Sequence, residues 1–116
     1  MKNLANFKIA LKTREYLIQA IYQMFFNNQE PDEIVEQFKK EHQLQKVDFE
    51  KFSESLLSVN KYKEEFKKIL IYLGIQDKDI SLLDKSIIYF AINELKFGNL
   101  DPLVVIDESL RLSKKF

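Results

Sequence analysis

Apolar residues near the N-terminus recur at intervals of three and four positions. The members of this stripe are Leu17, Ile18, Ile21, Met24 and Phe25. The spacing predicts an amphipathic helix from about Ile9 to Asn27 with one buried face. Lys8, Lys12 and Glu15 are also spaced by four and three residues, so they occupy a separate, hydrated strip of that helix.

Helix-breaking residues mark the start of a second helix. The polar segment Asn27–Gln29 interrupts the apolar pattern, and Pro31 suits the first turn of a new helix. Asp32 and Glu33 favour its positive N-terminal end. The residues predicted to face inward are Ile34, Val35 and Phe38. A polar loop is expected from His42 to Lys46.

A third apolar stripe extends over most of the middle of the chain. Asp48 can cap its N-terminus. The residues that repeat at helical spacing are Phe49, Phe52, Leu56, Val59, Tyr62, Phe66, Ile69, Leu70 and Leu73. Residues 48–73 are therefore predicted to form either one long bent helix or two helices. Gly74 is the expected terminator, because glycine adopts the left-handed conformation found at helix ends.

Two further helices are predicted in the last third, after a linker at residues 75–81. Ser81 to Asp84 resembles a capping box with Asp in place of Glu. The buried face that follows is Leu83, Ile87, Phe90, Ala91 and Leu95, and Gly98 ends it. Asp101 and Pro102 cap a final helix. Its inward residues are Val105, Ile106, Ser109, Leu110 and Leu112. Since no segment alternates as a strand does, the fold class is all-α with five to seven helices.

Composition restricts the class of protein. The chain has 116 residues, 46% hydrophobic and 31% charged, which is typical of one globular domain. The absence of Cys excludes disulfides, thiolate catalysis and Cys-ligated metals. It also favours a reducing compartment. With no signal-peptide pattern and no apolar run of membrane-spanning length, we expect a soluble cytoplasmic protein with no membrane association.

The charge distribution is uneven although the formal net charge is zero. Residues 1–27 carry four basic side chains against Glu15, a net of +3, and residues 28–60 carry eight acids against four lysines, a net of −4. A basic N-terminal helix is compatible with an approach to phosphate, whereas ordinary solvated helix faces would give the same imbalance. Both interpretations stay open on charge alone.

Three blocks resemble the NusB family of bacterial transcription antitermination factors. Arg14 to Gln23 resembles the family's Arg-x-x-Ala-x-Gln-Ala-Leu-Tyr opening, and Leu83 to Leu95 resembles its Leu-acid-basic-Ala-Ile-Leu-Arg helix. Pro102 to Ser109 resembles Pro-x-x-Val-x-Ile-Asn-Glu-Ala, and the residues up to Phe116 resemble the segment that follows it. The order of the blocks matches that of the family.

The resemblance implies a single domain over residues 1–116, a NusB-like bundle of two small helical subdomains at roughly 1–60 and 61–116. It implies a non-enzymatic protein that binds boxA-like single-stranded RNA of ribosomal RNA leader transcripts, together with the small-subunit ribosomal protein NusE, within the RNA polymerase antitermination complex. No cofactor, metal ion or catalytic residue is expected. Some family domains precede a methyltransferase domain, but this sequence has no glycine-rich cofactor loop.

The resemblance also selects candidate site residues. On the first helix, the RNA candidates are Lys8, Lys12, Arg14, Gln19 and Tyr22. The lysines and the arginine would contact phosphate, while the amide and the ring would meet unpaired bases. A solubilising helix face, with Tyr22 as a core aromatic, is the alternative. Asp79 and Asp84 are the candidates for contact with the basic ribosomal protein, and helix capping is the alternative for both.

The chain departs from the family pattern at several positions. Lysines occupy most of the place of an arginine cluster, Tyr89 replaces an Arg, and Asp107 replaces an Asn. The family pattern also continues past Phe116 into a closing helix. We therefore expect apolar surface that a second copy or a partner's helix covers, or a shortened subdomain that closes on itself. A NusB-like interaction module or homodimer that has lost RNA recognition is the alternative function.

Other features receive structural interpretations. A second basic patch consists of Lys61, Lys63, Lys67 and Lys68. Glu64 and Glu65 interrupt it, and pairing on the helix surface explains it. His42 has no second His nearby, so neither metal binding nor general base chemistry is expected. Glu94 is expected to bond across helices, and the ten Phe residues are expected in the core.

Overall fold

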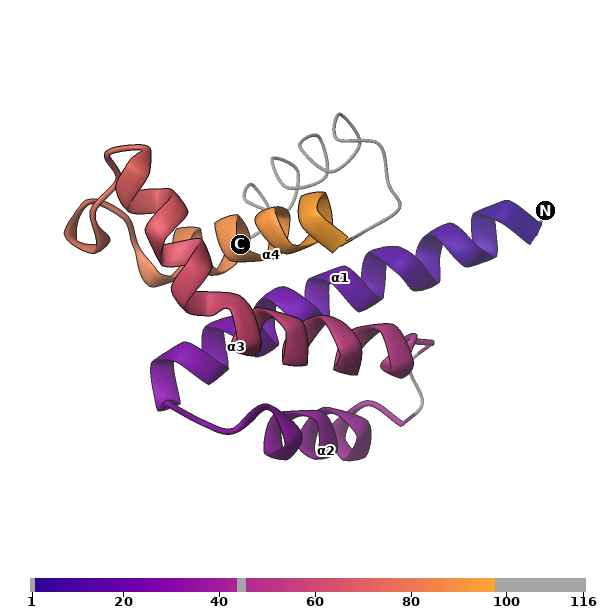
Figure 1. The fold of residues 1–116 in the computed structure, drawn as a ribbon. Coiled ribbons are helices and arrows are strands. Elements are labelled where there is room, and N and C mark those ends of the chain that lie inside the picture. Colours follow the sequence, from indigo (N-terminus) through magenta and orange to yellow (C-terminus); the bar gives the residue numbers. More distant parts are fainter. Residues whose placement is uncertain (1, 44–45, 98–116) are drawn as a thin grey trace. The chain divides into compact units, whose positions relative to one another are not determined.

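The computed structural model describes residues 2–43 and 46–97, with side chains from Leu4 onward, and this part is all-α (Figure 1). Its elements are α1 (Lys2–Asn27), α2 (Pro31–Glu41), α3 (Phe49–Tyr72), a 3₁₀ turn η1 (Asp77–Asp79) and α4 (Leu82–Phe97). The described residues contain no strand, which confirms the predicted class. The described residues contain four α-helices, fewer than the five to seven predicted for the whole chain.

The final helix predicted from Pro102 lies outside the described residues, as does Asp107. No helix in the described part of the chain is both long enough and apolar enough to span a membrane.

Helix α1 begins seven residues before the predicted start at Ile9. Leu4 and Phe7 in its first turns are 55% and 50% exposed, so the buried stripe from which the helix was predicted does not reach them. Once a helix has formed, each added residue gains a hydrogen bond, and no glycine or proline stops this extension. The start at Ile9 was therefore wrong, because that prediction rested on burial alone.

Residues at the helix N-termini define the starts of α2 and α3. Pro31 is the first residue of α2, with acids in its first turn and lysines in its last. At the start of α3, the Lys51 N–H donates to Asp48 Oδ1 (3.0 Å), which confirms Asp48 as a cap. The sequence left one or two helices open for residues 48–73, and the structure has one continuous helix.

A Schellman motif ends α3. Gly74 has φ +79°, the Ile75 N–H donates to the Leu70 carbonyl (2.9 Å), and the Gly74 N–H donates to the Ile71 carbonyl (2.9 Å). The predicted terminator is confirmed. Open space surrounds the position where a Cβ would stand, so the positive φ and not crowding favours glycine here.

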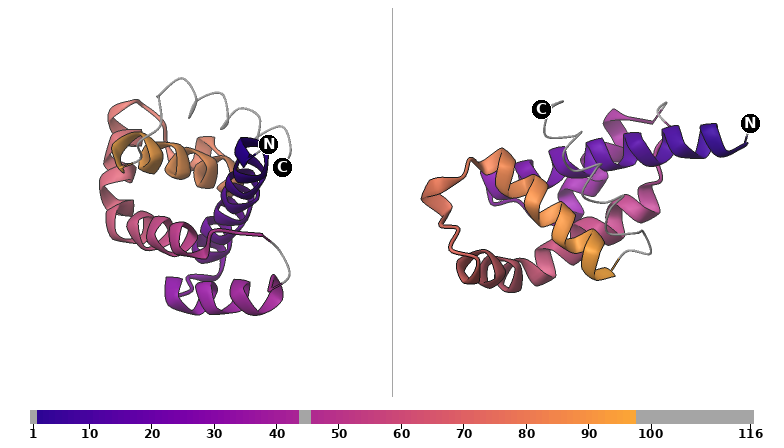
Figure 2. Two further views of the ribbon diagram at one scale, coloured as in Figure 1. Left: turned by 90° about the vertical axis from the view of Figure 1, so that its right-hand side faces the viewer. Right: turned by 90° about the horizontal axis from the view of Figure 1, so that it is seen from above.

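The chain divides into two compact units, Met1–Leu57 and Ser58–Phe116. The first unit contains α1, α2 and the start of α3, and the chain reverses direction between successive helices (Figures 1 and 2). In its core the Phe38 ring lies 6.0 Å from Tyr16 and 5.2 Å from Phe52, centroid to centroid. Buried Thr13 accepts a hydrogen bond from the Asp48 N–H (2.9 Å), which ties the start of α3 to α1.

The second unit contains the rest of α3, η1 and α4. The Phe66 ring meets Tyr89 edge to face at 5.7 Å, and the Ser58 hydroxyl donates to Asn93 Oδ1 at 2.6 Å. These two contacts hold the end of α3 against α4. The buried aromatic pair supplies apolar burial, and the hydrogen bond satisfies a polar side chain that is 4% exposed.

The predicted inward face of α4 is only partly right. Ile87 and Phe90 are buried as expected, but Leu95 is 46% exposed while Asn93 and Glu94 are buried. Helix α4 carries apolar residues around most of its circumference, so its periodicity does not single out one face.

Candidate nucleic-acid interface

Four of the five RNA candidates lie along one strip of α1, which we call the α1 strip. At 100° per residue, Lys12, Gln19 and Tyr22 fall within about 40° of Lys8 around the helix axis. Lys8 and Gln19 are exposed, the Lys12 side chain is 42% exposed, and Tyr22 is 36% exposed. The strip lies opposite the buried stripe of α1, so folding of the first unit keeps it accessible.

Arg14 lies apart from this strip. It is about 120° from Lys8 around the axis, and its side chain is half-buried and engaged with other groups. The structure therefore groups Lys8, Lys12, Gln19 and Tyr22 and leaves Arg14 on a different side of α1.

Part of the positive charge of the α1 strip is compensated within it. Lys12 Nζ lies 3.7 Å from Glu15 Oε2 and 5.5 Å from the Tyr16 ring centroid. A partly exposed ion pair contributes roughly 0–1 kcal/mol, so an approaching phosphate can compete with Glu15 for Lys12. Lys8, one turn nearer the N-terminus, is the more accessible of the two cations.

The structure adds Phe26 to the α1 strip. Phe26 is 67% exposed and stacks on Tyr22, with ring centroids 5.8 Å apart and planes inclined by 10°. The general expectation that the Phe residues are core does not hold for Phe26, nor for Phe7 and Phe97, which are 50% and 45% exposed. The exposure of Phe26 could have been predicted from its spacing, since it lies four residues after Tyr22 and on the side of the helix opposite the apolar stripe.

Both partner candidates are exposed near the N-terminus of α4. Asp79 lies in η1, and Asp84 lies in the first turn of α4, where its N–H donates to Ser81 Oγ (3.0 Å). This bond confirms Ser81 as the helix cap. Asp84 also suits the positive end of the helix, so its capping role and an exposed carboxylate coexist.

Tyr89, where the family pattern has Arg, is a core residue. It is 2% exposed, and burial, with the Asp77 and Glu64 carboxylates as smaller contributors, raises the pKa of its hydroxyl to about 12. Lys85 Nζ lies 5.6 Å from its ring centroid and 3.5 Å from Asp77 Oδ1. Tyr89 therefore does not present a contact surface to RNA. Glu94 is 4% exposed and has interaction partners.

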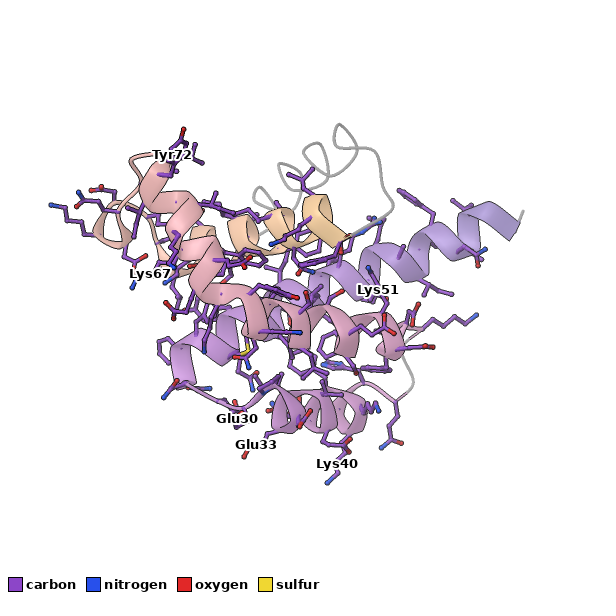
Figure 3. The ribbon with its side chains drawn as sticks, in the orientation of Figure 1. Glu30, Glu33, Lys40, Lys51, Lys67 and Tyr72 are labelled. Carbon is purple, nitrogen blue, oxygen red and sulfur yellow. The ribbon has the colours of Figure 1, made fainter. Side chains whose placement is uncertain are left out.

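His42 and the lysines of the second basic patch contact neighbouring residues of the fold. The His42 ring packs 4.2 Å from the Tyr16 ring and 5.5 Å from Phe38. In the second basic patch Lys63 donates to Asn60 Oδ1 (3.2 Å), and Lys67 extends from α3 (Figure 3). No cluster of three or more His, Cys, Asp or Glu side chains suited to a metal ion occurs among the described residues.

Most of the chain is similar in sequence to known proteins. The model of the NusB family matches residues 11–116. The transcription antitermination protein NusB of Coxiella burnetii (strain RSA 493 / Nine Mile phase I) is 31% identical over 105 residues, 89% of this chain and 76% of its own length. Those of Psychromonas ingrahamii and Aeromonas salmonicida are 31% and 32% identical, over 90% of this chain and 74% and 78% of their own lengths. A family match over this span, with relatives above 30% identity, shows that the chain belongs to the NusB family.

Proposed function

We propose that this chain is a non-enzymatic, RNA-binding transcription antitermination factor of the bacterial cytoplasm that acts on ribosomal RNA transcription. It binds boxA-like single-stranded RNA together with the ribosomal protein NusE, within the RNA polymerase antitermination complex. Family membership supports the role in antitermination, since its relatives are transcription antitermination proteins. The observation that carries RNA binding is the α1 strip, because it aligns two cations, an amide and an exposed aromatic ring.

Each group in the α1 strip suits a different part of single-stranded RNA. The ammonium groups of Lys8 and Lys12 attract phosphates, and the Gln19 amide can both donate to and accept from a base edge. The Tyr22 ring offers a face for stacking with an unpaired base. Arg14, although predicted with these residues, lies on another side of α1 and would contact a different part of the RNA.

The acidic side chains near the start of α4 support the protein partnership. Asp79 and Asp84 are exposed, and a ribosomal protein that binds RNA is basic. Complementary charge of this kind speeds association and orients the partners. We propose Asp79 and Asp84 as part of the NusE contact.

A second candidate is a NusB-like interaction module or homodimer without RNA recognition. The pairing of Lys12 with Glu15 favours it, because this ion pair reduces the positive charge of the α1 strip. The two candidates differ in whether the lysines of α1 contribute to binding RNA.

The test is a titration of a fluorescent boxA-like RNA, with and without NusE, at several salt concentrations. The paired change Lys8→Ala/Lys12→Ala is expected to weaken binding and to lower the salt slope by about 0.7 for each phosphate that is no longer neutralised. The matched control is Lys39→Ala/Lys40→Ala, which removes the same charge from the exposed face of α2 (Figure 3). Equal effects of the two variants, or no binding at low salt with NusE present, would contradict RNA binding by the α1 strip.

A further inference from the structure

The stacked Tyr22 and Phe26 rings are an unusual surface for a small helical unit. Phe26 is 67% exposed, although burial of a phenylalanine side chain is favourable. The two ring planes are nearly parallel, inclined by 10° with centroids 5.8 Å apart, and Phe26 is the more exposed of the two rings. Phe26 therefore offers an exposed π surface beside a second aromatic ring.

The surroundings of the two rings are polar, and amide groups predominate. Gln19 and Asn27 are exposed beside them, and Gln23 is held by hydrogen bonds to Gln29 (3.0 Å) and Gln37 (2.7 Å). A protein interface requires a larger apolar centre than two rings. Amides next to an aromatic face instead suit a base, which combines a flat π surface with donors and acceptors at its edges.

The two rings also continue the row of cations. Phe26 lies eighteen residues after Lys8, five full helical turns, so both project from the same side of α1 about 27 Å apart. RNA whose phosphates contact Lys8 and Lys12 can therefore follow the helix to the rings.

We infer that Phe26, supported by Tyr22, forms a stacking platform for one unpaired base of single-stranded RNA. The inference rests on the proposed function and adds to it a binding residue, Phe26. Stacking requires only a π face, so the platform contributes affinity with little preference among bases. Because the platform lies at the opposite end of the α1 strip from Lys8, the stacked base is expected at one end of the bound RNA segment.

Substitutions of Phe26 test the stacking directly, in the full chain with NusE and a boxA-like RNA. Phe26→Ala is expected to weaken RNA binding about 5- to 150-fold, the range for removal of one base–aromatic stack. Phe26→Tyr should keep most of the affinity, whereas Phe26→Leu, which is apolar but lacks a π face, should lose it. Phe7→Ala is the matched control, because Phe7 is also half-exposed on α1 but lies about 100° from Lys8.

An abasic scan of the RNA identifies the stacked base. When one nucleotide lacks its base, wild type and Phe26→Ala are expected to bind equally, while abasic substitution elsewhere preserves the difference between them. Because the chain has no Trp, Phe26→Trp introduces a single indole, whose emission should be quenched when that base stacks on it.

The outcomes separate this inference from the proposed function. If wild type binds RNA and Phe26→Ala binds equally well, the platform is overturned while RNA binding by the lysines stands. If Phe26→Ala weakens binding of NusE and not of RNA, the rings are a protein contact and the inference is wrong. If wild type binds no RNA at all, both fail.

Discussion

Tyr22 on α1 and Tyr89 on α4 have opposite surroundings. Tyr22 is 36% exposed and stacks on an exposed ring, whereas Tyr89 is 2% exposed and packs against Phe66. Helix α1 buries one stripe and leaves its polar strip in water. Helix α4 buries polar side chains as well, and the Ser86 hydroxyl there donates to the Leu82 carbonyl (2.8 Å).

Residue type alone therefore does not mark a contact surface. Two buried polar residues of α4 have their partners inside the second unit, since Ser86 donates to the backbone of α4 and Asn93 accepts from Ser58 on α3. On α1, by contrast, the Tyr22 and Phe26 rings remain partly exposed although burial of aromatic rings is favourable. Binding of an external ligand is the explanation that we propose for them.

The largest expected effect is on stability, when Tyr89 or Tyr22 is replaced by alanine. Tyr89→Ala is expected to lower the free energy of unfolding by about 3–5 kcal/mol, because it removes a buried ring and leaves a cavity. Tyr22→Ala should cost clearly less, since the side chain is 36% exposed and its removal leaves no enclosed cavity. Urea denaturation measures both values, and equal reductions would refute the contrast. RNA affinity should fall for Tyr22→Ala.

Stability at alkaline pH is expected to depend on Tyr89. Its hydroxyl has a pKa of about 12 in the folded protein against 10.0 as the ordinary value, so its contribution is complete below pH 10 and is lost as the pH rises through 12. Two pKa units correspond to about 2.7 kcal/mol at most. Tyr89→Phe should therefore flatten the fall of the unfolding free energy over this range. The measurement compares how steeply the unfolding free energy falls with pH in wild type and Tyr89→Phe. The absolute values are not compared, because removal of the hydroxyl also changes the unfolding free energy at neutral pH. Parallel slopes would contradict the assignment.

The smallest effect concerns the ion pair within the α1 strip. Glu15→Gln removes the carboxylate that lies 3.7 Å from Lys12 Nζ and should increase RNA affinity up to about fivefold, the equivalent of the roughly 1 kcal/mol upper range for such pairs. Glu33→Gln on the exposed face of α2 makes the same change of charge away from the strip (Figure 3). The idea fails if both variants raise affinity equally.

Local features made most of the helix limits predictable. Pro31, Gly74 and Ser81 each act on backbone groups within a few residues, so their roles follow from the sequence. The start of α1 did not follow, because the turns around Leu4 and Phe7 are helical without burying an apolar face. Helical spacing alone places Lys8, Lys12 and Gln19 on one side of α1, so this part of the site was predictable.

The all-α class and the common side of Lys8 and Lys12 on α1 follow from the order of the residues, because periodicity and capping depend on short stretches of chain. The motif blocks carry the resemblance to NusB. The exposure of Tyr22 and Leu95, and the burial of Tyr89 and Asn93, depend instead on how the helices pack. Burial depends on which distant residues pack against a side chain, and helical spacing carries no information about those neighbours. The stacking of Phe26 on Tyr22 became visible only once both rings were known to remain outside the core.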